Sequence, residues 1–138
     1  MYPAEIVNPM KQDLTSAGFK ELQTPDEVDA ALNAKTGTAL VVVNSVCGCA
    51  AGACRPGVKQ AIAAAGKRPD HLYTVFAGFD TEATAQARKY FLPYPPSSPC
   101  IALFKDGKLA HFIERHHIEG RSADMIAEHL KEVFAEYC

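Results

Sequence analysis

A continuous run of β-branched and apolar residues from Thr38 to Asn44 (TALVVVN) constrains the fold of this chain more than any other segment. A strand with one solvent-facing side alternates apolar and polar residues, whereas this run is apolar almost without interruption. The run therefore predicts a strand that is buried on both faces. Such a strand belongs to a sheet that is covered by helices on each side.

Three further strands are predicted downstream of this run. They are Leu72–Ala77, which is a second buried run, Cys100–Lys105, and Leu109–Glu114. Asp106-Gly107 separates the last two and is a strong hairpin signal. The first two strands are joined through a helix, so they should be parallel with a right-handed crossover, and the last two should pair as an antiparallel hairpin.

Capping residues and apolar periodicity predict five helices. Asn8-Pro9 is expected to start the first helix, which ends at Gly18. The other four are expected at about residues 24–35, 55–65, 80–92 and 122–137, and the last presents Met125, Ile126, Leu130, Val133 and Phe134 on one face. No linker or repeat divides the chain, so the sequence predicts a single α/β domain over residues 1–138, with a mixed central sheet flanked by helices.

The composition excludes several functional classes. The 138 residues are 48% hydrophobic and carry a net charge of −2, which gives no general attraction to nucleic acid or to an anionic membrane. The longest apolar block, Ala39–Val43, is far too short to cross a bilayer. Residues 1–5 contain no basic region followed by a long apolar run. We therefore expect a cytoplasmic protein without nucleic-acid or membrane partners.

The chain has five cysteines, an odd number that cannot all pair within one molecule. They are Cys47, Cys49, Cys54, Cys100 and Cys138. In a chain expected in the cytoplasm, reactive or metal-binding thiols are a better expectation than a structural disulfide framework. Cys138 is the last residue, and we expect it to be frayed and incidental.

The Cys47-Gly48-Cys49 motif carries the chemistry that the sequence predicts. Cys47 lies three residues beyond the strand end at Asn44, and a helix follows, whose backbone N–H groups favour a thiolate. A disulfide across one glycine closes a small, strained ring, which is easily reduced and suits a transient bond. From the order of the two residues we assign Cys47 as the nucleophile and Cys49 as the resolving thiol.

Two other classes of function compete with this hypothesis. Cys47, Cys49 and Cys54 could bind a metal as three thiolates, with Cys100 or a histidine as the fourth ligand. Structural zinc sites usually separate paired cysteines by two to four residues, so copper(I) or an iron–sulfur cluster would tolerate this spacing better. A non-catalytic scaffold is the third class, and the intact Cys-Gly-Cys motif argues against it.

Charged and aromatic residues near the motif have simpler interpretations. Arg55 is expected to be a solvated charge at a helix start, although it could stabilise a nearby thiolate. His116 and His117 are expected to be surface or packing residues at the end of a hairpin strand rather than acid–base groups or ligands.

Three stretches of the sequence resemble the bacilliredoxin family. The segment 43–52 (VNSVCGCAAG) is similar to the active-site segment of that family. The segments 95–108 (PPSSPCIALFKDGK) and 114–121 (ERHHIEGR) are similar to two later stretches, in the same order. The resemblance extends over nearly the whole chain and implies a thioredoxin-like fold with extra N-terminal helices.

The family resemblance also implies a function. It implies a thiol–disulfide oxidoreductase that removes bacillithiol, a low-molecular-weight thiol used by some bacteria in place of glutathione, from S-bacillithiolated proteins. The implied partners are those proteins, bacillithiol itself as co-substrate, and a disulfide reductase, with no other cofactor and no metal. A general disulfide reductase or isomerase activity is a further possibility.

Particular residues acquire expected roles from the same resemblance. It implies that Gly48, Ser98 and Pro99 contact the substrate and that Pro99 follows a cis peptide bond. Cys54 and Cys100 depart from the family pattern. Either could act as an alternative resolving thiol, because Cys100 directly follows Pro99 and could approach Cys47.

Overall fold

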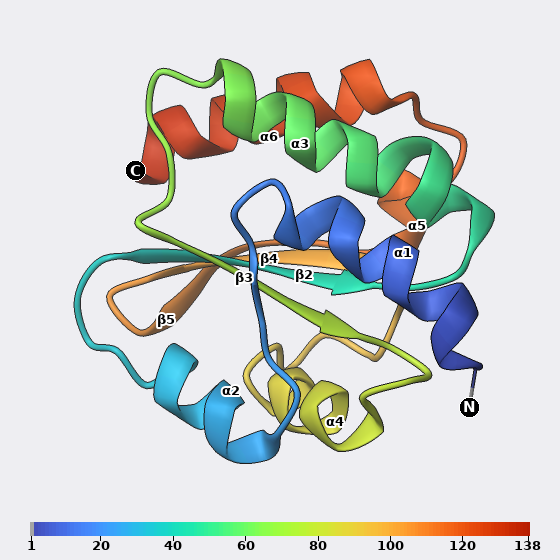
Figure 1. The fold of residues 1–138 in the computed structure, drawn as a ribbon. Helices are drawn as coiled ribbons and strands as arrows, with labels where there is room; N and C mark the ends of the chain where they lie inside the picture. The colour runs from blue at the N-terminus through green and yellow to red at the C-terminus, as the bar shows by residue number, and fades with distance from the viewer. Residues whose placement is uncertain (1) are drawn as a thin grey trace.

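The computed structural model describes residues 2–138, which form a five-stranded mixed sheet with helices on both faces (Figure 1). The strands are β1 (Lys20–Glu21), β2 (Thr38–Asn44), β3 (His71–Phe76), β4 (Cys100–Lys105) and β5 (Lys108–Ile113). The helices are α1 (Ala4–Thr15), α2 (Pro25–Leu32), the π-helical turn η1 (Ala50–Cys54), α3 (Arg55–Ala64), α4 (Thr81–Lys89), α5 (Arg115–Ile118) and α6 (Ala123–Tyr137). The order of strands across the sheet is β1-β3-β2-β4-β5.

Strand β2 lies at the centre of the sheet, and all seven of its residues are buried, as its apolar sequence predicts. It pairs in parallel with β3 on one side and antiparallel with β4 on the other. Strands β4 and β5 form the antiparallel hairpin predicted from Asp106-Gly107. The four predicted strands are therefore confirmed to within one residue at either end.

Two apolar cores lie on opposite faces of the sheet. On one face Leu40 and Val42 of β2 pack with residues from α1, α3 and α6, including Leu14, Val58 and Phe134. On the other face Val41 and Val43 pack with residues from α2 and α4. Figure 1 shows the same division, with α1, α3 and α6 above the sheet and α2 and α4 below it. The alternation of side chains along one strand thus supplies both cores.

The start of the first helix differs from the prediction. Helix α1 begins at Ala4, so Asn8 does not cap it and Pro9 lies inside the helix. Proline lacks an N–H, so the carbonyl of Glu5 loses the bond it would accept within the helix. Glu5 and Pro9 are both exposed, so the carbonyl is accessible to solvent and its lost bond costs little.

Other differences involve short elements and one side chain. Strand β1 has two residues, and α5 has four, so neither carries a periodic signal that sequence reasoning could detect. His116 and His117 consequently lie in α5 and are exposed, rather than at the end of a strand. Met125 is 52% exposed and lies outside the buried face of α6 that was predicted to include it.

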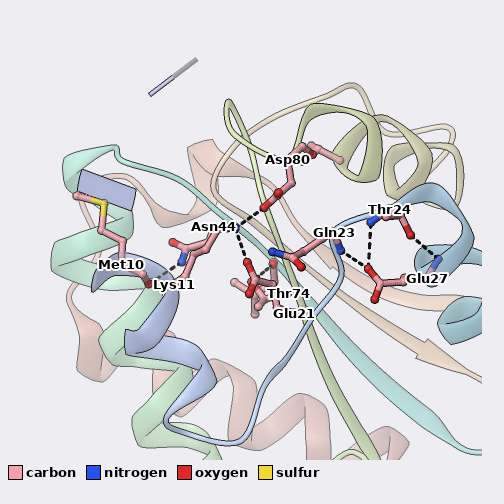
Figure 2. A network of polar contacts seen from close by, with 11 residues as sticks. Met10, Lys11, Glu21, Gln23, Thr24, Glu27, Asn44, Thr74 and Asp80 are labelled. Carbon is pink, nitrogen blue, oxygen red and sulfur yellow. Dashed lines mark hydrogen bonds and ion pairs between the residues drawn. The ribbon is translucent and has the colours of Figure 1, made fainter. Parts of the chain in front are cut away.

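A network of polar contacts ties α1 to the carboxyl edge of the sheet (Figure 2). The buried ammonium of Lys11 forms ion pairs with Glu21 of β1 and, at 2.7 Å, with the Oδ2 atom of Asp80. The side-chain amide of Asn44 at the end of β2 donates to the carbonyl of Met10 at 3.0 Å. Helix α1 is therefore held against the end of the strand that leads into the Cys-Gly-Cys motif.

Candidate functional site

Four strands of the sheet have an end at the edge where Cys47 lies. Strands β2 and β3 are parallel and end together, since Asn44 is in register with Phe76. Strand β4 is antiparallel and begins at the same edge, where Cys100 is in register with Val43. Strand β5 ends there, and Arg115 follows it. The topology therefore brings together segments that are far apart in the sequence.

The helix after the motif begins earlier than predicted. The carbonyl of Cys47 accepts hydrogen bonds from the N–H groups of Ala50 and Ala51, at 3.0 and 3.2 Å. The π-helical turn η1 then occupies residues 50–54, before the predicted helix start at about residue 55, and continues into α3. Turns of this type are rare and often occur at functional sites. The motif thus lies directly at a helix N-terminus, as the thiolate hypothesis requires.

The two sulfur atoms of the motif form a hydrogen-bonded pair. The Sγ atoms of Cys47 and Cys49 are 2.6 Å apart, and both residues are half-buried. The backbone N–H of Cys49 also donates to the Sγ of Cys47, at 3.4 Å. The N–H bond stabilises a thiolate on Cys47, and in the sulfur–sulfur contact the thiol that keeps its proton is the donor.

The pKa values of the two thiols move in opposite directions. Burial opposes ionisation of Cys47, but hydrogen bonds from the Cys49 thiol and from backbone N–H groups lower its pKa below the ordinary value of 9.0. The pKa of Cys49 is raised by burial and by the neighbouring Cys47 thiolate. The two groups interact, so they titrate as a pair whose first proton leaves chiefly from Cys47. This asymmetry favours the predicted assignment of Cys47 as the nucleophile.

We expect the alkylation of Cys47 to report this asymmetry. Its rate with iodoacetamide should rise with a midpoint below pH 9.0, and that midpoint should move upward in Cys49→Ala, which lacks the donor to Cys47. Cys49→Ser, whose hydroxyl can still donate, should show the smaller change. Peptide mass spectrometry at a series of pH values measures this. A midpoint that does not move in Cys49→Ala would contradict the hydrogen-bond explanation.

The turn before β4 lies beside the motif. The Ser98–Pro99 peptide bond is cis, as the family resemblance implied, and Pro99 is buried. Leu92–Pro93 is also cis, which the sequence reasoning did not anticipate. Ser98 and Cys47 line the same surface groove, whereas Gly48 is exposed. The structure therefore brings the predicted substrate-contacting residues Ser98 and Pro99 to the edge that carries Cys47.

Arg115 is a site residue that the sequence reasoning missed. Its guanidinium donates from Nη1 to the carbonyl of Ser98 at 3.2 Å and forms an ion pair with Glu119. Its positive charge contributes to lowering the pKa of both cysteines of the motif, although burial keeps the pKa of Cys49 above its ordinary value. Arg115 comes shortly after β5, which ends at this edge. That position in the sequence is the signal from which Arg115 could have been predicted as a site residue.

Arg55 is not the solvated charge that its sequence position predicts, because it is 5% exposed. Its positive charge opposes the rise in the pKa of the Cys54 thiol. Its Nη1 donates to the Oδ1 of Asn44 at 2.9 Å and to the carbonyl of Ser45 at 2.8 Å, and its Nε lies 3.3 Å from a carboxylate oxygen of Asp13. Arg55 therefore fixes the backbone that leads from β2 into the motif.

The remaining thiols lie in less reactive surroundings. Cys54 and Cys100 are fully buried, and burial raises the pKa of Cys54 and raises that of Cys100 to about 12. Neither is therefore ionised near neutral pH. Cys138 is half-buried and packs against the core, and its N–H donates to the carbonyl of Phe134 at 2.8 Å, so the prediction of a frayed residue is wrong.

The structure does not bring together the three thiolates that the metal-binding alternative requires. Within residues 2–138, the one group of three side chains with ligand atoms within 4.8 Å of one another is Glu114, His116 and His117. The geometry of the described cysteines thus favours thiol exchange over the metal-binding alternative.

Comparisons with known proteins agree with this geometry. The family described as disulphide isomerase matches residues 2–138. A protein named bacilliredoxin from Cytophaga hutchinsonii is 62% identical over 136 residues, which are 99% of both chains. The chain belongs to the bacilliredoxin family. A second bacilliredoxin, from Salinibacter ruber, is 54% identical over 99% of this chain and 81% of that protein.

Solved structures of thioredoxins share the fold. Mitochondrial thioredoxin 3 from Saccharomyces cerevisiae, in its oxidized form, superposes with a TM-score of 0.58 at 18% identity and covers 90% of this chain and 98% of that one. A Malassezia sympodialis thioredoxin gives a TM-score of 0.56 at 13% identity, over 87% and 90%. The predicted thioredoxin-like fold is therefore confirmed. Membership of the bacilliredoxin family confirms the predicted thiol–disulfide oxidoreductase activity.

Proposed function

We propose that this protein reduces mixed disulfides between bacillithiol and cytoplasmic proteins, with Cys47 as the nucleophile. The observation that carries the proposal is the pair of sulfur atoms 2.6 Å apart at a helix N-terminus, where the pKa of Cys47 is lowered and that of Cys49 is raised. The names of the similar proteins support bacillithiol as the co-substrate. Helices of residues 2–138 lack the length and apolar character that a bilayer span requires.

The reaction proceeds by two thiol–disulfide exchanges. The Cys47 thiolate attacks the bacillithiol sulfur of the mixed disulfide, the S–S bond breaks, and the substrate protein leaves as a thiolate that takes up a proton. Cys47 then holds bacillithiol in a new disulfide. Cys49 can attack Cys47 and release bacillithiol, or a free thiol can do so, and a disulfide reductase supplies the two electrons that restore the pair.

Mass spectrometry of trapped adducts tests this assignment. The wild type, Cys47→Ser and Cys49→Ser are incubated with a bacillithiolated protein and digested without reductant. We expect Cys49→Ser to accumulate one bacillithiol adduct on Cys47, Cys47→Ser to carry none, and the wild type to turn over. Cys138→Ser is the control and should behave as the wild type, because it removes a thiol outside the motif that packs against the core at the end of α6.

The results can contradict the proposal in two ways. If Cys47→Ser forms an adduct on Cys49 as fast as the wild type attacks the same substrate, the roles of the two thiols are reversed. Trapped disulfides with the substrate protein rather than bacillithiol would favour the general reductase or isomerase alternative, which the disulphide isomerase description of the family also suggests. Rescue of a scrambled disulfide-containing protein would then measure that activity directly.

A further inference from the structure

A groove at the carboxyl edge of the sheet has the size of a small-molecule site. Its volume is about 360 Å³, and its lining includes Ser45, Cys47, Arg88, Ser98 and Arg115. Sites for small ligands start at roughly 300 Å³. The groove therefore suits the low-molecular-weight half of a mixed disulfide rather than a folded protein.

The charge of this groove is positive and only partly compensated. Of the described residues that line it, two are arginines and none carries a carboxylate. Arg115 already forms an ion pair with Glu119. Arg88, in the last turn of α4, has no ion-pair partner within residues 2–138, and its buried Nε has no hydrogen-bond partner among them.

A guanidinium without an ion-pair partner in a groove is suited to bind an anion, because arginine matches a carboxylate through two parallel hydrogen bonds. Arg88 is also close enough to the Cys100 thiol to oppose the burial that raises the pKa of that group. Cys100 is in register with Val43, four residues before Cys47. The Arg88 guanidinium and the Cys47 thiol thus line the same groove.

We propose that Arg88 binds a carboxylate on the small thiol of a mixed disulfide and makes this site selective for anionic low-molecular-weight thiols. This inference rests on the proposed function, in which Cys47 accepts the small thiol. With its carboxylate on Arg88, the small thiol presents its sulfur to Cys47. The S–S bond breaks, the new disulfide joins Cys47 to the small thiol, and the protein thiolate leaves.

The test uses one protein coupled through a disulfide to three small thiols that differ mainly in charge: 3-mercaptopropionate, 2-mercaptoethanol and cysteamine. The kcat/KM of the wild type is measured for release of the protein thiol from each. We expect the anionic adduct to react about 10-fold faster than the neutral one, and the cationic adduct to be slowest. Ionic strength is held constant, because screening weakens exposed charge interactions.

Three variants separate local from general electrostatics. Arg88→Met removes the charge but keeps most of the apolar stem, and it should bring the anionic and neutral adducts to within about twofold of one another. Arg88→Lys should retain most of the preference. Arg68→Gln changes the net charge by the same amount, but Arg68 is exposed and precedes β3 at the opposite edge of the sheet, so it should leave the preference unchanged.

The outcomes distinguish this inference from the proposed function. A preference that survives in Arg88→Met, or that is lost equally in Arg68→Gln, overturns the role of Arg88 while Cys47 still accepts the thiol. Equal rates for the three adducts in the wild type also overturn it. Absence of any adduct on Cys47 overturns the proposed function itself. Circular dichroism of Arg88→Met, together with its rate on the neutral adduct, excludes misfolding as the cause.

Discussion

Cys47→Ser is expected to lower the rate of mixed-disulfide reduction by at least about 1000-fold, because a neutral serine hydroxyl is a far weaker nucleophile than a thiolate. The structure gives the loss a specific origin. The N–H of Cys49 donates to the Cys47 sulfur, and the contact between the two sulfurs lowers the pKa of Cys47 while it raises that of Cys49. No other described cysteine combines partial exposure with a lowered pKa. The release of protein thiol from a bacillithiolated substrate measures the effect.

Cys49→Ser provides the comparison for this loss. The serine hydroxyl can still donate to the Cys47 thiolate, so the first exchange should proceed within about 10-fold of the wild-type rate. Turnover then depends on added free thiol, because the resolving group is absent. Residual turnover in Cys47→Ser above about one tenth of the wild-type rate would show that another thiol performs the attack, and it would remove Cys47 from the mechanism.

The strands were predictable because their signals are local and strong. The run from Thr38 to Asn44 can only be a buried strand, and Asp106-Gly107 can hardly be anything other than a turn. The start of α1 was not predictable from the same rules. Asn8-Pro9 is a good local signal for a helix start, but the burial of Val7 and Leu14 on one face extends the helix to Ala4. Packing of the whole helix outweighed the local preference around one proline.

The site was predictable in its chemistry and less so in its surroundings. Two cysteines around one glycine after a buried strand indicate exchange chemistry by their spacing alone. Arg88 and Arg115 lie 41 and 68 positions after Cys47, and the order of strands across the sheet is what brings both to the same edge. Arg55 has a sequence position typical of a surface residue, yet two acceptors and Asp13 hold it in the interior. Such contacts depend on topology, which one sequence does not display.

Lys11→Met is expected to lower the free energy of unfolding by about 3 kcal/mol, because it removes the cation from between two carboxylates. The Lys11 side chain is 8% exposed, and those of Glu21 and Asp80 are 25% and 12% exposed. The ammonium also lies 4.5 Å from the centroid of the Phe79 ring, a favourable cation–π contact. Urea denaturation near neutral pH, under reducing conditions, measures the change.

The pH dependence of this difference identifies its electrostatic origin. Burial alone would lower the pKa of Lys11, but its bonds to Asp80 and Glu21 outweigh burial and raise the pKa above the ordinary value of 10.5. A group with a raised folded pKa contributes its full stability below the unfolded value and loses it as the pH rises through the folded one. The difference between the wild type and Lys11→Met should therefore be constant up to pH 10.5 and shrink above it.

Lys59→Met is the matched control for Lys11→Met, because Lys59 also pairs with a carboxylate, at 2.6 Å from Asp13, but its side chain is 39% exposed. A partly exposed pair of this kind contributes at most about 1 kcal/mol. Adding Glu21→Gln and Asp80→Asn to Lys11→Met should restore much of the lost stability, since the two uncompensated charges are then removed. If Lys11→Met costs no more than Lys59→Met, the Lys11 network does not hold α1 against the edge of the sheet that carries Cys47.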